Sequence, residues 1–309
     1  MKKKILMAVD DSIHSHHSMR YAIQILSESQ DVTFTLFHVQ PIISQYLLDE
    51  ARTDSKANAT LKKTIKKTTV EAQMLLEKQK ERMITMGIAD ERIEMLTQPR
   101  MLGLARDILE YARKGIYDAI VVGRRGLSRI QKTFMGSTSA NLLEGAEATP
   151  VWMVDGNVTS QRVLVAVDGS ESSYRALSHV ELMLSGNPEI KYSLLHVSGE
   201  VKDIDAISLG KDDPVVKDLF TKGSERLIGT FFADAEQKLK EAGIADSQVE
   251  FIRSKRRAKV GKMILEEANQ RDCGTVVVGR RGADRSHFFG SVSRYVTERI
   301  TDRALWLIP

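Results

Sequence analysis

Glycines and hydroxyl residues that could bind an anion follow an apolar segment of the sequence. After Ala119–Val122 come Gly123 and Gly126, and Gly136 follows after nine further residues. Glycine lets the backbone approach a ligand closely, and serine or threonine at a helix start adds hydroxyls beside unpaired backbone N–H groups. The hydroxyl residues here are Ser137, Thr138 and Ser139. We therefore expect an anion site at the end of a buried strand.

A shorter version of this segment occurs near the end of the sequence. Val276–Val278 precede Gly279 and Gly282, and Gly290 opens the second hydroxyl-bearing run. The residues after that glycine are Ser291, Val292 and Ser293. Between Gly282 and Gly290 lie seven residues instead of nine. The shorter loop either draws the helix start away from the first glycines or binds an anion in an altered geometry.

Strands that alternate with helices are expected to position these loops. The strands predicted from short apolar runs are 4–9, 32–39, 92–96, 119–122 and 150–154. Apolar residues three and four positions apart predict helices between them, for example at Met19, Ala22 and Leu26. A loop is expected over 41–58, and a long charged helix with an exposed polar face over Ala59–Met86. This alternation favours a parallel sheet covered on both faces, which is a doubly wound domain.

The whole pattern is duplicated. Asp168 lies 158 residues after Asp10, each at the end of an apolar run, and Gly279 lies 156 residues after Gly123. We predict two tandem doubly wound, Rossmann-like α/β domains, each with a parallel five-stranded sheet. The predicted domains are 1–156 and 161–309. Ligands of such domains bind outside the carboxyl ends of the strands, where the winding reverses.

Composition excludes several classes of protein. Hydrophobic residues make up 42% and charged residues 28% of the chain, as in soluble globular proteins. The net charge of +4 indicates a mixed-charge surface and no nucleic-acid partner. The single cysteine, Cys273, excludes an intramolecular disulfide and a cysteine-rich metal site, and a small apolar role is expected for it.

Neither a membrane segment nor a protein metal site is expected. No stretch approaches the roughly 18 apolar residues of a membrane span. The basic start of the chain leads into an apolar run that stops at Asp10, too early for a signal peptide, so we expect a cytoplasmic protein. His14, His16 and His17 lack cysteine partners or an acidic frame, which favours a surface helix start over a metal site.

These motifs resemble the universal stress protein family over nearly the whole sequence. Members that bind nucleotide carry Gly, two residues, Gly, nine residues, Gly and then Ser or Thr. The matching residues are Gly123, Gly126, Gly136 and Ser137. Two further family features are Val-Asp followed by a small residue and Ser, and His-Val at the end of the second strand. The first matches at Asp10 and Asp168, and the second at Val39 and Val197.

The resemblance implies an adenine nucleotide α-hydrolase-like fold and an ATP site in each complete copy. Asp10 would lie near the ribose and phosphates, and the backbone of Val39 would pair with adenine. The phosphates would pass Gly123 and Gly126 and be held by Gly136, Ser137 and Thr138. Arg124 and Arg125 add positive charge that the motif itself does not require. The corresponding residues of the second copy are Asp168, Val197, Gly279, Gly282, Gly290, Ser291 and Val292.

The resemblance also concerns the metal and the partners. Mg²⁺ would arrive with ATP, and Asp10 is the one protein carboxylate expected nearby. The short apolar strands Pro150–Val154 and Ala304–Ile308 are suited to pairing at a sheet edge. Family members are expected to dimerise through this strand, either between the halves of one chain or between two chains.

Three functions remain open from the residues. The sequence has no Walker-type lysine after the loop and no general base identified beside a nucleophile, so no catalytic residue is assigned. We expect a stress-response regulator or sensor that acts through ATP occupancy, with slow and incidental hydrolysis at most. The alternatives are a dimerising scaffold that binds no nucleotide and an ATP-hydrolysing or adenylate-transferring enzyme.

Overall fold

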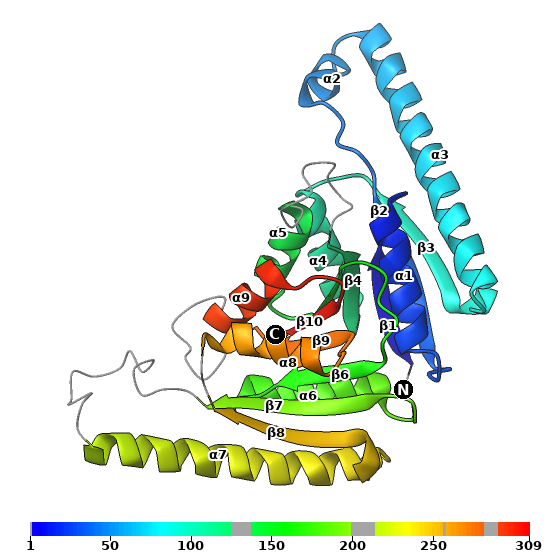
Figure 1. The fold of residues 1–309 in the computed structure, drawn as a ribbon. Coiled ribbons are helices and arrows are strands. Elements are labelled where there is room, and N and C mark those ends of the chain that lie inside the picture. The colour runs from blue at the N-terminus through cyan, green and yellow to red at the C-terminus, as the bar shows by residue number, and fades with distance from the viewer. Residues whose placement is uncertain (1, 125–136, 199–213, 256–257, 281–289) are drawn as a thin grey trace. The chain divides into compact units, whose positions relative to one another are not determined.

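The computed structural model contains two compact units (Figure 1). It describes residues 2–124, 137–198, 214–255, 258–280 and 290–309. Unit 1 comprises Met1–Gln24 and Gln30–Asp155, and unit 2 comprises Ile25–Ser29 and Gly156–Pro309. Within the described residues each unit holds a five-stranded parallel sheet, so the predicted tandem doubly wound α/β fold is confirmed.

The sheet of unit 1 has the strand order β3-β2-β1-β4-β5. Its strands are β1 Lys3–Ala8, β2 Val32–Val39, β3 Ile93–Gln98, β4 Ala119–Gly123 and β5 Val151–Val154. Ala8 pairs with Phe37 on one side of β1, and Met7 pairs with Val121 on the other. The chain builds the sheet outward from β1 in one direction and then returns to add β4 on the other side. The winding therefore reverses between β1 and β4, where ligands of such sheets bind.

Helices cover both faces of this sheet. They are α1 Ile13–Ile25, α2 Gln45–Glu50, α3 Ser55–Thr85, α4 Leu104–Lys114 and α5 Ser137–Gly145, with a short 3₁₀ helix η1 at Asp90–Arg92. Right-handed crossovers place α1 and α3 on one face and α4 and α5 on the other. The ring of Phe37 in β2 stacks on Tyr111 of α4 with centroids 4.7 Å apart. Figure 1 shows that the first half of α3 projects beyond the sheet, with α2 beside it.

The region before the long helix differs from the sequence-based expectation. Residues 41–58 were expected to be a loop, but they contain α2 and the first turn of α3. The carboxylate of Asp54 accepts hydrogen bonds from the N–H groups of Lys56 and Ala57, at 2.6 and 3.1 Å. This N-cap starts α3 at Ser55, four residues before the predicted Ala59, because it satisfies N–H groups that a helix start leaves unpaired.

The sheet of unit 2 has the corresponding order β8-β7-β6-β9-β10. Its strands are β6 Arg162–Ala166, β7 Lys191–Ser198, β8 Val249–Lys255, β9 Thr275–Gly279 and β10 Ala304–Ile308. Its helices are α6 Glu171–Leu184, α7 Pro214–Glu241, α8 Val260–Gln270 and α9 Ser291–Arg299, with a 3₁₀ helix η3 at Asp246–Gln248. The parallel pairings of β6 with β7 and with β9 repeat those of β1.

The described helices do not include a membrane span. Even α3 and α7, which have 31 and 28 residues, lack an apolar stretch long enough to cross a bilayer.

Candidate functional site

A cavity of about 200 Å³ opens at the carboxyl edge of the unit 1 sheet. Its walls come from the ends of β1 and β2, from the loop after β3 and from the first turns of α4. Two of the residues expected to bind nucleotide, Asp10 and Val39, line it. Gln40, Arg100 and Leu104 line it as well. The strand order brings these residues together, because β1 and β2 are neighbours and end at the same edge.

The backbone of Val39 faces this cavity. The N–H of Val9 donates to the Phe37 carbonyl at 3.0 Å, and the N–H of Gln40 donates to the Gln98 carbonyl at 2.9 Å. In a parallel strand, backbone groups of alternate residues point to opposite neighbours. Those of Val39 therefore point toward β1, like those of Phe37, but β1 has already ended. The N–H and the carbonyl of Val39 therefore lie side by side at the cavity, where they offer a ligand one donor and one acceptor.

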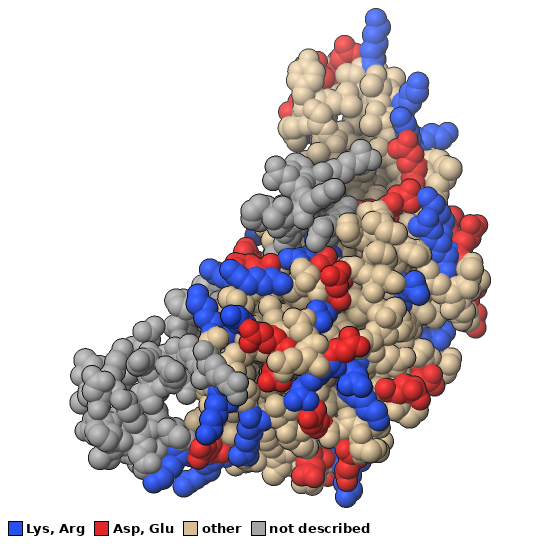
Figure 2. Space-filling model, viewed as in Figure 1, with Lys and Arg blue, Asp and Glu red and all other residues tan. Residues whose placement is uncertain are grey.

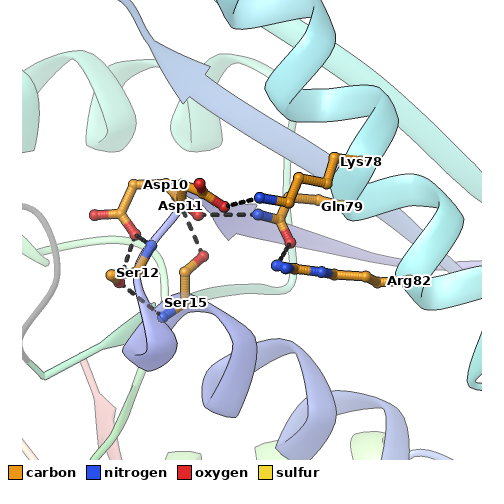
Figure 3. A network of polar contacts seen from close by, with 7 residues as sticks. All are labelled: Asp10, Asp11, Ser12, Ser15, Lys78, Gln79 and Arg82. Carbon is orange, nitrogen blue, oxygen red and sulfur yellow. Dashed lines mark hydrogen bonds and ion pairs between the residues drawn. The ribbon is translucent and has the colours of Figure 1, made fainter.

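Asp10 is held in one orientation by the residues after it (Figure 3). Its Oδ1 accepts hydrogen bonds from the N–H of Ser12 at 3.0 Å and from the Ser12 hydroxyl at 2.6 Å. The N–H of Asp10 donates to the Ser15 hydroxyl at 3.2 Å. The other carboxylate oxygen, Oδ2, forms no hydrogen bond to a described residue, and Figure 3 shows that it points away from Ser12. Asp10 can therefore accept a hydrogen bond from a ligand without losing its own support.

The long helix α3 holds the loop after β1 from the other side through hydrogen bonds and an ion pair. The amide of Gln79 donates to the Asp10 carbonyl at 3.1 Å, and Arg82 donates to the Gln79 side-chain oxygen at 3.0 Å. Gln79 is completely buried. Lys78 forms an exposed ion pair with Asp11 at 2.7 Å. Its hydrogen bond lowers the pKa of the Asp11 carboxyl below its ordinary value.

Sequence reasoning missed the role of Gln79, because the whole helix was interpreted as an exposed charged face. A signal was nevertheless present. The buried residues of α3 are Ala72, Leu76, Gln79 and Met83. Their spacings of four, three and four residues define one side of a helix. A glutamine within such an otherwise apolar stripe indicates a buried polar contact.

The loop that carries Arg100 was also missed. The carboxylate of Asp107 accepts hydrogen bonds from the N–H groups of Met101 and Leu102, at 3.0 and 2.9 Å. Gly103 adopts φ 111°, which favours glycine. These contacts fix the loop before α4 and bring the positive charge of Arg100 to the cavity that holds Asp10. An aspartate in the first turn of the predicted helix was the available signal.

Gly123 has a packing role in the structure. A Cβ added there would lie 2.8 Å from the backbone carbon and oxygen of His14 in α1. Glycine is thus needed for α1 to sit against the end of β4, whether or not a ligand is bound. The hydroxyl of Ser139 donates to the Gly123 carbonyl at 3.0 Å and ties the start of α5 to the same strand end. Thr138, the second residue of α5, is buried.

Part of the predicted phosphate loop lies outside the described residues. This applies to Arg125, Gly126 and Gly136, and to the side chain of Ser137. Arg124 is described, and its guanidinium forms an ion pair with Asp155 at 3.2 Å. Its positive charge is therefore offset by a carboxylate of the protein.

Unit 2 repeats the aspartate motif with different support. Oδ1 of Asp168 accepts hydrogen bonds from the Ser170 N–H at 3.0 Å and from the Ser173 hydroxyl at 2.8 Å. The residue between the aspartate and the first serine is Gly169, with φ 77°, and a Cβ there would lie 2.8 Å from Leu227 of α7. Val197 is the last residue but one of β7, and the N–H of Val167 donates to the Leu195 carbonyl as that of Val9 donates to Phe37 in unit 1.

The helix start of unit 2 attaches one position further along the strand end. The Ser293 hydroxyl and the Gly290 N–H both donate to the Arg280 carbonyl, at 2.9 and 3.0 Å. In unit 1 the corresponding serine contacts Gly123, whose counterpart is Gly279 and not Arg280. Ser291 is exposed and Val292 is half-buried, while Gly282 lies outside the described residues.

No cluster of three or more His, Cys, Asp or Glu residues that could hold a metal ion occurs in the part of the chain that the structure describes. The two strand-end histidines have structural partners, because Nδ1 of His38 and of His196 bonds to the carbonyls of Val9 and Val167. Burial raises the pKa of the Cys273 thiol to about 11, in keeping with the small apolar role expected for it.

The parallel sheets, the reversal of winding at β1 and the cavity beside it define a tandem doubly wound α/β protein with a candidate ligand site at the carboxyl edge. The family model described as the universal stress protein family matches residues 1–155 and again residues 159–301. The chain belongs to this family.

Individual relatives agree with this assignment. A universal stress protein of Mycolicibacterium smegmatis is 26% identical, with 99% of this chain and 97% of the relative covered. The crystal structure of a universal stress protein from Archaeoglobus fulgidus covers 100% of this chain and 98% of its own, with a TM-score of 0.66 and 20% identity. A structure from Pseudomonas aeruginosa has a TM-score of 0.60 and 13% identity, and it covers 99% of this chain and 92% of its own. These two structures support the fold.

Proposed function

We propose that this universal stress protein binds ATP in the unit 1 cavity and acts as a cytoplasmic stress-response regulator through nucleotide occupancy. The observation that carries the proposal is that Val39 and Asp10 line the same cavity. A backbone donor and acceptor and an oriented carboxylate face one cavity at the reversal point of the sheet. One solved universal stress protein is described in complex with cAMP, so the family includes a protein that binds a nucleotide.

Each group has a distinct part in holding the nucleotide. The Val39 N–H would donate to adenine N1, and its carbonyl would accept from the adenine amino group. Asp10 Oδ2 would accept a hydrogen bond from a ribose hydroxyl. The start of α5 at Ser137 would face the phosphates with its unpaired N–H groups, beside Gly123 and the loop glycines. ATP supplies the negative charge that this helix start would bind, and Mg²⁺ would accompany the triphosphate.

The arrangement favours binding over turnover. Among the described residues that line this cavity, Asp10 is the one carboxylate, and its contact with the Ser12 hydroxyl holds the loop after β1. We propose that any hydrolysis is slow. The predicted domains 1–156 and 161–309 would associate through β5 and β10, within a chain or between chains, as the family resemblance implies.

The experiment measures nucleotide released from purified, acid-denatured protein by chromatography, and uptake of Mg-ATP and Mg-GTP by calorimetry. The matched variants are Asp10→Asn and Asp168→Asn. We expect ATP to bind at least about tenfold more tightly than GTP, since guanine presents the opposite donor and acceptor order to Val39. Asp10→Asn should weaken ATP binding at least about tenfold.

The two variants separate the units. Loss of binding in Asp10→Asn together with retention in Asp168→Asn would assign the site to unit 1. Equal losses would indicate two working sites. Protein that neither releases nor takes up nucleotide, while its circular dichroism shows an intact fold, would contradict the proposal and favour a dimerising scaffold. The altered attachment of α9 at Arg280 is the feature that favours such a role for unit 2.

A further inference from the structure

One side of α3 carries opposite charges at its two ends. Positions with alternating spacings of four and three residues lie along one side of a helix. From the middle of the first half of α3 to its last turns, this side carries Lys63, Lys67, Val70, Met74, Glu77 and Glu81. We call these six residues the outer stripe. It passes from a basic segment through an apolar pair to an acidic segment.

The outer stripe faces solvent. At 3.6 residues per turn, it lies about half a turn from the buried stripe that contains Leu76 and Met83. All six side chains are exposed, including 44% of Val70 and 67% of Met74. The apolar pair therefore has no role in the core of unit 1. Figure 2 shows lysine or arginine side chains along one edge of the projecting end of α3, with acidic side chains beside them.

The stability of the helix itself does not account for this charge order. The helix dipole favours acidic residues near the N-terminus and basic residues near the C-terminus, and the stripe has the reverse order. Lys63, Glu77 and Glu81 form no ion pair within the described residues. Lys67 reaches Glu71 at 3.8 Å, but both side chains are exposed, so this pair contributes little.

The stripe is complementary to itself in the antiparallel direction. Consider two antiparallel copies of α3 that cross at the level of Ala72 along the helix axis. Val70 of each copy then faces Met74 of the other. In the same register Lys67 faces Glu77, and Lys63 faces Glu81. We propose that α3 docks against α3 of a second copy of this chain through the outer stripe. This site is separate from the nucleotide cavity and from the terminal strands.

The shape of unit 1 suits this contact. Alternating spacings of four and three residues allow two helices to pack along their length at a shallow angle. The stripe from Lys63 to Glu81 spans about 27 Å at 1.5 Å per residue. Because the first half of α3 projects beyond its own sheet (Figure 1), it can lie along the sheet-packed half of the other copy. The resulting interface is isologous and closes as a dimer.

Other partners fit the stripe less well. A nucleic acid or an anionic membrane would attract the lysines, but it would repel Glu77 and Glu81 and gain nothing from the order of the charges. A second copy satisfies both charged segments and covers the apolar pair. Charge complementarity therefore selects a second copy of the chain.

The test uses two charge-reversed variants of the full chain, Lys63→Glu with Lys67→Glu and Glu77→Lys with Glu81→Lys. Each variant alone places like charges opposite each other in the antiparallel pair. We expect its self-association constant, measured by sedimentation at low salt, to fall at least about tenfold. An equimolar mixture of the two variants should associate as wild type does, because every facing pair again has opposite charges.

A matched control changes the same amount of charge away from α3. Lys240→Glu with Lys262→Glu, both exposed in unit 2, should leave association unchanged. Circular dichroism verifies the fold of every variant. The proposal would be overturned if the wild-type chain stayed monomeric. It would also be overturned if the Lys63→Glu, Lys67→Glu variant still associated by itself, or if the mixture of the two variants failed to associate. Pairing through the terminal strands would give the second result, since it does not involve the stripe.

Discussion

In unit 1 the loop after the first strand is held by a distant helix, whereas in unit 2 the equivalent loop relies on its own glycine. Gln79 of α3 bonds to the Asp10 carbonyl. In unit 2, Gly169 adopts φ 77° and packs closely against Leu227 of α7. Both loops still orient an aspartate through a nearby serine. The comparison teaches that the local Asp–Ser contact survives when its support changes from a hydrogen bond to close packing.

The helix starts differ in a related way. Ser139 contacts Gly123, while Ser293 contacts Arg280, one position further along. The intervening segment has nine residues between its second and third glycines in unit 1 and seven in unit 2. A shorter connection brings the helix start onto a later carbonyl. The difference in loop length accords with the difference in the strand-end carbonyl that the serine reaches.

The largest effect is expected at the end of β4, where the close approach of α1 depends on Gly123. Gly123→Ala would place a Cβ 2.8 Å from the His14 backbone, which cannot give way as a flexible side chain would. We expect the free energy of unfolding to fall by about 2–3 kcal/mol, measured by chemical denaturation. The control is Gly223→Ala in α7, where nothing lies within 4 Å, and which should stabilise by about 0.5–1 kcal/mol. Equal effects of both changes would contradict the packing role of Gly123.

The support from α3 can be removed directly. Gln79→Leu replaces the buried amide with an apolar side chain of similar size and leaves the Asp10 carbonyl without its side-chain donor. We expect a loss of about 1–3 kcal/mol in the free energy of unfolding, since an unsatisfied buried acceptor is costly. If unit 1 binds ATP, its affinity should fall too, because the loop that orients Asp10 loses its clamp. Unchanged stability would mean that the Asp–Ser contact suffices in both units.

The two serine contacts provide a matched pair. Ser139→Ala removes the buried hydrogen bond to Gly123, and Ser293→Ala removes the one to Arg280 together with a longer contact to the Gly290 carbonyl at 3.2 Å. Each change should cost about 1 kcal/mol in thermal or chemical unfolding. In the proposed function, only Ser139→Ala should also weaken ATP binding, as calorimetry would report. Equal losses of affinity would argue that unit 2 binds nucleotide despite its shorter loop.

The smallest effect is expected at the exposed pair of Lys78 and Asp11, which unit 2 replaces by Gly169. Asp11→Asn should cost only a few tenths of a kcal/mol at pH 7, because solvent screens an exposed pair. The pKa of Asp11 is lowered in the folded protein, so the contribution is complete above the ordinary carboxyl pKa and is lost as pH falls through the lowered value. Wild type and Asp11→Asn should therefore converge in stability in strong acid. A difference that grew on acidification would contradict this account.

The sequence alone determined the fold class, the duplication and the two ends of the candidate site. Apolar runs and helical spacings recur in order, and motifs such as Asp10–Ser12 act through neighbouring residues. Because carboxyl ends of parallel strands meet at one edge, Asp10 and Val39 could be expected to approach each other. The extra helix α2 was missed, since six residues of which none is buried give little periodicity.

Only the tertiary structure decided what holds the site and what faces solvent. Gln79 is 69 residues from Asp10 in the chain, and His14 meets Gly123 across 109 residues. Composition and local spacing carry no information about such contacts, because they arise when whole helices pack on the sheet. For the same reason, the sequence did not show that Gly123, expected to lie beside the phosphates, also packs closely against α1, or that α3 has one buried and one outer stripe.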